Sequence, residues 1–251
     1  MVVDILDGRA ADLPGWERCG FQLVAHTSAV RDWSDDDEIA AVHHSELEIL
    51  AGELTGCDHA TVSGHIKRGP EQAAHHADLA PIEFVHSDFA AGYEALIRRS
   101  GRERPRNAVV PAMSRNGLTA ESYEDARRIV VMQFWRNLGP SRMDLPIAFC
   151  DARTVFLDDA RPFLVRDDAG AGGPEFEALA IRAPSEPDRH RWCAFPELCP
   201  DEVVAFRTYD TELVRSGRTY FTPHAAFRDP AVALGEPARS SIELRAVCLF
   251  S

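Results

Sequence analysis

Three short motifs in this sequence pair a histidine with an acidic residue two positions later, a spacing that could place both side chains on one metal ion. They are His86-Ser87-Asp88, His76-Ala77-Asp78 and His44-Ser45-Glu46. Residues two apart share a face only on a β-strand. The segment Ile82–Val85, directly before His86, is rich in residues that favour strands. We therefore expect His86 and Asp88 to bind a metal ion.

The other two motifs lie in segments with a different pattern. His76 and Asp78 belong to an alanine-rich stretch that is typical of a helix or a loop, and His44 and Glu46 fall inside a predicted helix. On a helix, residues two apart point in different directions. We interpret both pairs as solvated surface positions and not as metal ligands.

A third ligand would complete a site of two histidines and one carboxylate, an arrangement that leaves other coordination positions open. His224 is the best candidate, because it lies in the apolar, strand-like segment Tyr220–Phe227. A single histidine in such a segment is more often a hydrogen-bonded core residue. The segment by itself leaves both interpretations open.

The residues that follow favour the metal-site interpretation. Arg239-Ser240-Ser241 leads into the last strand-like segment, and on a strand Arg239 and Ser241 would share a face. An arginine that points into a protein interior is costly unless an anion meets it. A guanidinium group and a hydroxyl together suit a carboxylate. We therefore expect Arg239 and Ser241 to bind a carboxylate near the metal.

Short strand-like segments, separated by Pro, Gly and Asp, dominate the chain after residue 128, and such a series is typical of a sandwich or a jelly roll. The predicted strands are Ile129–Trp135, Pro146–Cys150, Thr154–Leu157, Glu177–Ala183, Arg191–Phe195, Glu202–Tyr209, Thr219–Phe227 and Ser241–Phe250, preceded by Gly20–His26 and His59–Ile66. The predicted fold class is mainly β with flanking helices.

Three helices are expected to flank these strands. One covers residues 35–55, with Ser34 as its N-cap and Gly56 at its end, and the others cover 89–99 and 119–128. No linker or internal repeat divides the chain. We expect a single domain over residues 1–251, with a helical and strand elaboration at about 1–80 and a jelly-roll core at about 81–251.

Composition excludes several classes of function. The 40 acidic residues exceed the 27 basic ones, and the net charge of −13 disfavours nucleic acid or an anionic membrane as a partner. The apolar runs are too short to span a bilayer, and the N-terminus has no basic segment of a signal peptide. The six cysteines form no C-x-x-C motif, so we expect reduced thiols in a cytoplasmic protein. The expected partner is a small-molecule substrate, and a homodimer is left open.

Taken in chain order, the H-x-D motif, the distant histidine and the R-x-S motif resemble the Fe(II)/2-oxoglutarate-dependent dioxygenases, which are double-stranded β-helix (jelly-roll, cupin-like) enzymes. The resemblance is greatest to the branch of the cephalosporin methoxylase component CmcJ, the gibberellin desaturase-like proteins and the fungal oxygenases AsaB and NvfI. The matching stretches are 84–88, 134–136, 144–148, 151–153, 201–203, 209–210, 224–230 and 239–245.

This resemblance implies that His86, Asp88 and His224 bind Fe(II), and that Arg239, helped by Ser241, holds the distal carboxylate of 2-oxoglutarate. It also implies an O₂-dependent oxygenase that tailors a small molecule, namely a natural product or an amino-acid-derived metabolite. The outcome would be hydroxylation, desaturation or cyclisation, with release of succinate and CO₂. Gln133, Arg136 and Arg245 receive no role.

Two alternatives remain at this point. A zinc-dependent hydrolase or isomerase could use the same three ligands, although zinc chemistry gives no task to Arg239 and Ser241. A jelly-roll protein that binds without catalysis is the other alternative, and the intact triad of potential ligands argues against it.

Overall fold

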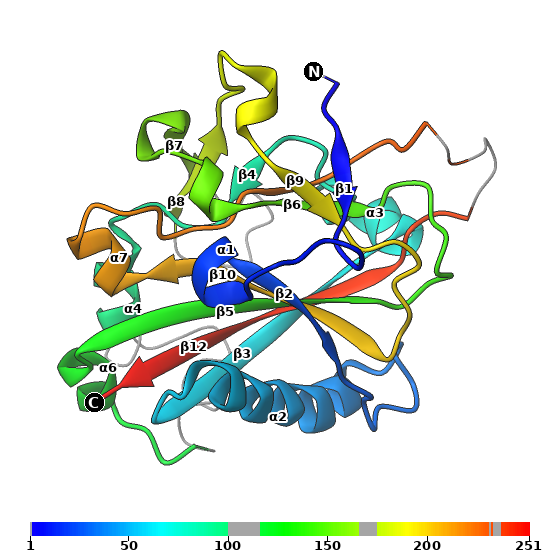
Figure 1. The fold of residues 1–251 in the computed structure, drawn as a ribbon. Coiled ribbons are helices and arrows are strands. Elements are labelled where there is room, and N and C mark those ends of the chain that lie inside the picture. The colour runs from blue at the N-terminus through cyan, green and yellow to red at the C-terminus, as the bar shows by residue number, and fades with distance from the viewer. Residues whose placement is uncertain (1, 100–115, 166–174, 231, 233–236) are drawn as a thin grey trace.

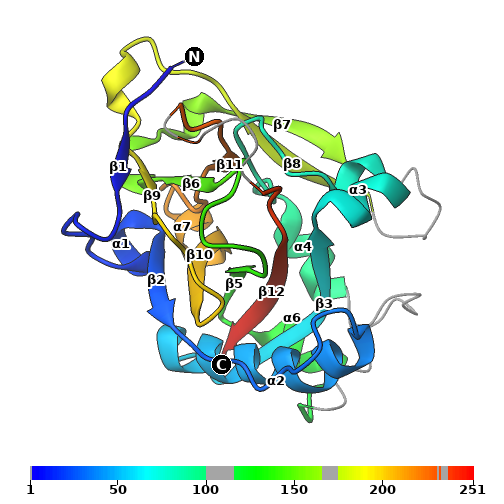
Figure 2. The same ribbon diagram turned by 90° about the vertical axis from the view of Figure 1, so that its right-hand side faces the viewer.

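Two β-sheets stack face to face in the computed structural model, which describes residues 2–99, 116–165, 175–230, 232 and 237–251 (Figure 1, Figure 2). The larger sheet contains, in order, β1 (Ile5–Asp7), β9 (Trp192–Ala194), β6 (Ile147–Cys150), β11 (His224–Ala226), β4 (His86–Ser87), β8 (Phe176–Ile181) and β7 (Ala160–Val165). The smaller sheet contains β2 (Phe21–Ala25), β10 (Glu202–Asp210), β5 (Arg128–Asn137), β12 (Ser241–Phe250) and β3 (His59–Arg68). This is the predicted jelly-roll fold class.

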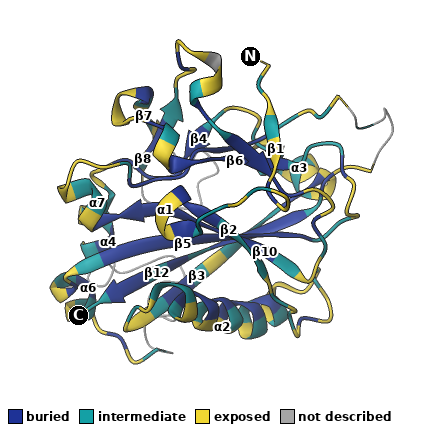
Figure 3. Ribbon diagram, viewed as in Figure 1, coloured by how far each residue is buried: buried dark blue, intermediate teal, exposed yellow. Residues whose placement is uncertain are grey.

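A long helix, α2 (Asp36–Thr55), covers the outer face of the smaller sheet (Figure 1, Figure 2). Its apolar side chains pack against every second residue of β5 and β12, and this layer includes Ile39, Leu47, Leu50, Val130, Met132, Phe134, Ile242 and Leu244. The alternate residues of the same strands therefore point inward, between the two sheets. Because both faces are covered, β5 and β12 are buried along most of their length (Figure 3).

The start of α2 differs from the prediction by one residue. Asp35, and not Ser34, is the N-cap, and its side chain accepts hydrogen bonds from the backbone N–H groups of Asp37 and Glu38. Ser34 instead donates to Asp32 in the preceding turn. A carboxylate at this position also matches the positive end of the helix dipole. The helix ends where predicted, at Gly56, which has a left-handed φ of 67°.

The remaining helices of the described residues are short. They are α1 (Trp16–Cys19), α3 (Pro70–His75), α4 (Tyr93–Arg99), α6 (Ala120–Asp125) and α7 (Thr211–Arg215), together with the 3₁₀ turns η1 (Ala77–Leu79), η2 (Ala152–Thr154), η3 (Leu157–Asp159) and η4 (Pro187–Arg189). The two short helices expected from sequence are present as α4 and α6, but both are shorter than predicted. None of the described helices combines the length and apolar character that crossing a bilayer requires.

One predicted strand is wrong. Thr154–Leu157 forms no strand and instead lies across η2 and η3. Two aspartates favour these turns, because Asp151 accepts from the N–H of Arg153 and Asp159 accepts from the N–H of Phe156. Side chains that bond to nearby backbone in this way compete with strand pairing. The structure also contains two strands that the sequence pattern does not predict, β1 and β7.

Candidate metal centre

Strand register brings the two histidines of the candidate site together. His224 in β11 pairs directly with His86 in β4, and their ring centroids lie 4.4 Å apart. Asp88 follows β4 immediately. One potential ligand atom from each of the three residues lies within 4.8 Å of the others, and all three residues are buried. Two imidazoles and one carboxylate at this spacing are a donor set that suits Fe(II).

Hydrogen bonds hold both imidazoles in the orientation that a metal requires. The Nδ1–H group of His86 donates to the carbonyl of Phe84 at 2.9 Å, and that of His224 donates to the carbonyl of Thr222 at 3.1 Å. A carbonyl only accepts, so each Nδ1 carries the proton and each Nε2 keeps a free lone pair. A histidine ligand is commonly fixed by such a bond.

The electrostatic surroundings keep His224 and Asp88 in their metal-binding protonation states. Burial, together with the neighbouring His86, lowers the pKa of His224 to about 4, which leaves its imidazole neutral. Burial alone would raise the pKa of Asp88. The guanidinium of Arg245, which is close to the carboxylate and donates to it, outweighs that effect and holds the pKa below its usual range. Neutral imidazoles and an ionised carboxylate are the forms that bind metals.

Arg239 lines the same cavity as the three potential ligands, and so does Trp135. The Arg239 guanidinium lies over the Trp135 ring at 5.6 Å and donates from Nη1 to the carbonyl of Leu145 at 3.2 Å. Among the described residues, nothing accepts from Arg239 Nε or Trp135 Nε1, although both atoms are buried. Burial lowers the pKa of Arg239 to about 10, so the group is still a cation at neutral pH. The cavity therefore contains two unmatched donors, one of them charged.

Ser241 lies two residues after Arg239, at the first position of β12, and is buried. Glu243 and Arg245 continue the same alternation along the inward face of this strand. Glu243 also lines the metal cavity, where it pairs with Arg68 of β3 at 3.0 Å. Sequence reasoning missed Arg68 and Glu243. The signal for Glu243 was a pair of ionisable side chains, Glu243 and Arg245, two residues apart in an otherwise apolar strand.

Gln133, Arg136 and Arg245 received no role from the sequence, and the structure places them on two different faces of the smaller sheet. Gln133 points inward and accepts from Arg245 Nε, which also donates to Asp88. Arg136 lies on the opposite face of β5, where it bonds to His26 and to the carbonyl of Pro200. Only Gln133 and Arg245 of these three therefore belong to the surroundings of the metal centre.

The other two acidic motifs lie elsewhere. Asp78 is exposed and His76 is half-buried, in contact with solvent as expected, with 3.6 Å between His76 Nδ1 and the carboxylate. The expectation of a solvated surface is wrong for His44, which is buried and lies 3.1 Å from a ring nitrogen of His65. The cause is that α2 turns this side chain toward the sheet that it covers.

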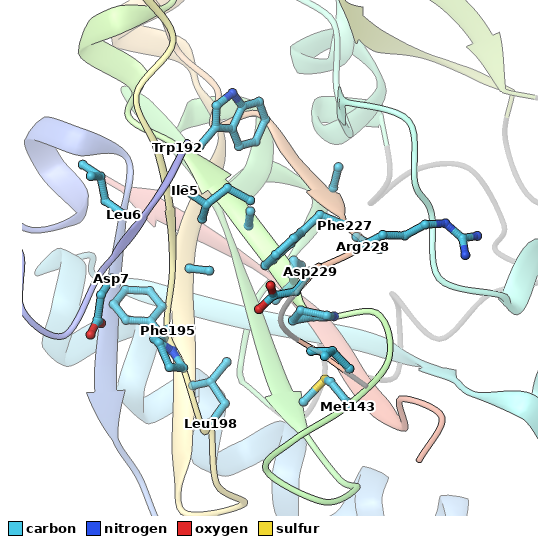
Figure 4. A pocket seen from close by; sticks show the side chains of 18 of the residues that line it. Ile5, Leu6, Asp7, Met143, Trp192, Phe195, Leu198, Phe227, Arg228 and Asp229 are labelled. Atoms are coloured by element: carbon cyan, nitrogen blue, oxygen red, sulfur yellow. The ribbon is translucent and has the colours of Figure 1, made fainter. Parts of the chain in front are cut away.

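A larger hollow of about 890 Å³ adjoins the metal cavity and shares Trp135, Ile147, Ala225 and Ala226 with it. Figure 4 shows this hollow with apolar side chains such as those of Ile5, Phe227 and Met143 on its walls. Its size lies in the range of pockets that hold small organic molecules, about 300–1,000 Å³.

Comparisons with known proteins agree with this geometry. The YDMC family model, described as an oxidoreductase/YMDC permease-like domain, matches residues 2–249. The hydroxylase/desaturase EfuI of Hormonema carpetanum is 28% identical over 93% of this chain and 78% of its own length. The Fe(II)/2-oxoglutarate-dependent dioxygenase NvfI of Aspergillus novofumigatus is 32% identical over 83% of this chain and 68% of its own. A solved structure of the iron and alpha-ketoglutarate-dependent endoperoxidase NvfI has 21% identity and a TM-score of 0.73 over 99% of this chain and 85% of that one.

Fold and donor set together define a jelly-roll protein of the non-haem iron class. The chain belongs to the YDMC family, and within it to the branch of Fe(II)/2-oxoglutarate-dependent dioxygenases that includes NvfI and EfuI. This confirms the resemblance seen in the sequence.

Proposed function

We propose that this protein is an Fe(II)/2-oxoglutarate-dependent oxygenase in which His86, Asp88 and His224 bind the metal. Arg239, helped by Ser241, holds the distal carboxylate of 2-oxoglutarate. The substrate is a small molecule, namely a natural product or an amino-acid-derived metabolite, and the products include succinate and CO₂. The observation that carries the proposal is one cavity lined by the three potential ligands and by Arg239, whose buried Nε has no acceptor among the described residues.

Each side chain has a defined task in this proposal. His86 and His224 offer Nε2 lone pairs, and Asp88 supplies the negative charge that stabilises a divalent cation. When bound, Fe(II) with 2-oxoglutarate and O₂ supplies the oxidising chemistry that removes hydrogen from a C–H bond. Arg239 and Trp135 orient the cosubstrate with N–H groups that lack other partners among the described residues. The buried walls exclude water from the reaction.

A zinc hydrolase fits the same three ligands less well. Hydrolysis would leave Arg239 Nε and the indole N–H of Trp135 buried without an acceptor among the described residues, and an unmatched buried donor costs about 1–3 kcal/mol, more if charged. A dicarboxylate cosubstrate satisfies both groups. The adjoining hollow, with its apolar walls, supports an organic substrate.

The test combines metal analysis with an assay of succinate release. We expect one Fe(II) per chain, and we expect His86→Ala and His224→Ala each to abolish metal binding and turnover. His76→Ala is the matched control, because it removes a histidine of an H-x-D motif that lies outside the metal cavity. Equal metal binding by wild type and His86→Ala would refute the ligand assignment. A protein that binds iron but never consumes 2-oxoglutarate would refute the activity.

We further propose that residues 1–251 act as one domain in the cytoplasm, without a nucleic-acid partner. Pairing of β1, β2 and β3 with strands from the rest of the chain supports a single domain. The six free thiols support a reducing compartment, and the net charge of −13 argues against nucleic acid. A homodimer is the oligomeric state to test, by light scattering of the purified protein.

A further inference from the structure

We propose that Arg245 is a positioning residue, which holds the Asp88 carboxylate by one oxygen so that the other oxygen is free for the metal. The inference rests on the proposed function, in which Asp88 is a metal ligand. It assigns a task to a side chain that touches neither the metal nor the cosubstrate.

The contact between the two side chains is direct. Arg245 Nε donates to Asp88 Oδ2 at 3.1 Å. No group of the described residues donates to Oδ1, which therefore remains available. A carboxylate held at one oxygen presents the other in a single direction, and such outer partners of metal ligands orient the ligand.

Three further contacts keep the guanidinium in place. Gln133 lies directly opposite Arg245 in the pairing of β12 with β5, and its Oε1 accepts from Arg245 Nε at 3.1 Å. The guanidinium also lies over the ring of Phe89 at 5.6 Å, and Phe89 is the neighbour of Asp88 in the chain. Glu243 Oε1 lies 4.0 Å from Arg245 Nη2. The arginine is therefore braced from two strands and from the segment that carries the ligand.

Strand pairing is irregular at this point of the sheet. Leu244 pairs with His65 and Ala246 with Val62, so two residues of β3 face the single residue Arg245. Bulges of this kind change the local twist and re-aim a side chain, and they are common next to active sites. The irregularity lies where the side chain must reach Asp88.

Arg245 and its neighbour Arg68 pair with different carboxylates. Glu243 already pairs with Arg68 at 3.0 Å, so its charge has a partner without Arg245. Within the described part of the chain, Arg245 is the arginine or lysine that forms an ion pair with Asp88, at 3.1 Å. Arg245 is thus the group that balances Asp88 before a metal arrives.

Two effects of Arg245 on a metal ion have opposite signs, which makes the proposal testable. Its positive charge repels a divalent cation, so a purely electrostatic role predicts tighter metal binding when the charge is removed. A positioning role predicts weaker binding. Loss of an outer partner of this type weakens metal affinity about 10- to 100-fold.

The experiment titrates Co(II), as a spectroscopic probe, into the purified metal-free protein and its variants. For Arg245→Gln we expect about 10- to 100-fold weaker Co(II) binding and an altered d–d absorption spectrum. Arg245→Lys keeps the charge but not the Nε–H donor, so we expect weaker binding than in wild type and only partial rescue. This variant also keeps the test decisive if Arg245→Gln does not fold. Gln133→Leu should shift both readouts in the same direction, but less.

Arg128→Gln is the matched control. Arg128 also pairs with a buried aspartate, Asp210 at 2.6 Å, and its side chain is 32% exposed against 30% for Arg245. It lies outside the metal cavity, so Co(II) affinity and spectrum should be those of wild type. Unchanged or tighter Co(II) binding by Arg245→Gln and Arg245→Lys would overturn the inference. Unchanged binding by Asp88→Asn would instead overturn the proposed function.

Discussion

Replacing Arg239 by methionine removes the only cationic side chain proposed to hold the distal carboxylate of 2-oxoglutarate. Methionine keeps most of the side-chain length, so packing against Trp135 is largely retained. Arg239 is 3% exposed, and its guanidinium donates, within the described residues, only to the carbonyl of Leu145. None of the described carboxylates lies within ion-pair distance of it. The substitution therefore removes a buried charge that the cosubstrate, and not the protein, is expected to satisfy.

The magnitude follows from this burial. Removing one side of a buried, hydrogen-bonded charge pair costs about 2–5 kcal/mol. At ~1.4 kcal/mol per tenfold change, 2-oxoglutarate should bind roughly 30- to several-thousand-fold more weakly. Metal binding should not change, because Arg239 is not among the potential ligands. Arg239→Lys should recover only part of the affinity, since an ammonium group restores the charge but not the two-pronged geometry.

Stability measurements give an independent readout. Without 2-oxoglutarate, Arg239→Met should be no less stable than wild type, because the substitution removes an unpaired buried charge. Cosubstrate at 100 times the wild-type Kd stabilises wild type by about 2.7 kcal/mol. With 30-fold weaker binding the same concentration would stabilise the variant by only about 0.9 kcal/mol. A structural arginine would give the opposite result, with stability lost and cosubstrate affinity intact.

The assay is an anaerobic titration of 2-oxoglutarate into the Fe(II)-loaded protein, followed by the metal-to-ligand charge-transfer band. Arg207→Met is the matched control, because Arg207 is also 3% exposed, also has a buried Nε without a partner among the described residues, and lies outside the metal cavity. Burial lowers the pKa of Arg207 to about 10, as it does for Arg239. Identical titration curves for wild type and Arg239→Met would refute the cosubstrate assignment.

Three further predictions concern stability. Arg68→Met leaves the buried Glu243 with Gln133 at 3.4 Å and Arg245 at 4.0 Å as its remaining partners, so urea unfolding should show a loss of about 3 kcal/mol. Burial, opposed by the hydrogen bond to Glu46, lowers the pKa of His43 to about 4. Below pH ~6.5 the unfolded chain therefore takes up a proton at His43 that the folded protein does not. The free energy of unfolding should fall between pH ~6.5 and 4, and it should fall by less in His43→Gln. Asp35→Ala should cost about 1 kcal/mol in thermal unfolding, through loss of the N-cap.

Each of these predictions has an outcome that contradicts it. Wild-type stability of Arg68→Met would mean that Arg245 alone satisfies Glu243. Parallel pH profiles of wild type and His43→Gln would show that other groups cause the loss at low pH. If Ser34→Ala lowered the thermal stability as much as Asp35→Ala does, Asp35 would not be the principal N-cap of α2. For reference, exposed ion pairs such as Arg228–Glu83 contribute about 0–1 kcal/mol.

Local patterns in the sequence were sufficient for much of this protein. The short runs of strand-favouring residues in β5 and β12 and the helical spacing of α2 predicted these elements closely, because composition and period are local properties of the chain. The strand-favouring residues before His86 selected, among three motifs with the same spacing, the H-x-D pair that the structure brings next to His224. The prediction failed for Thr154–Leu157, where aspartate side chains bond to the backbone and compete with a strand.

The strand predicted before His86 shows how a local pattern can be only partly correct. Ile82–Val85 has the composition of a strand, yet β4 contains only His86 and Ser87. The carbonyls of Ile82 and Val85 still accept from the neighbouring Ala226 and Ile181. These two hydrogen bonds therefore fix the segment that leads to His86 and Asp88, although the segment does not pair continuously as a β-strand.

Only the tertiary structure determines which strands pair with each other, and in which register. Sequence could name His224, but the direct pairing of β11 with β4 is what places its ring 4.4 Å from that of His86. Arg68 and Arg245 come from different strands, and their assignment to Glu243 and Asp88 depends on the register of β3, β12 and β5. A shift of one residue in that register would turn these charges to the opposite face. Register results from packing of the whole sandwich, so no local pattern contains it.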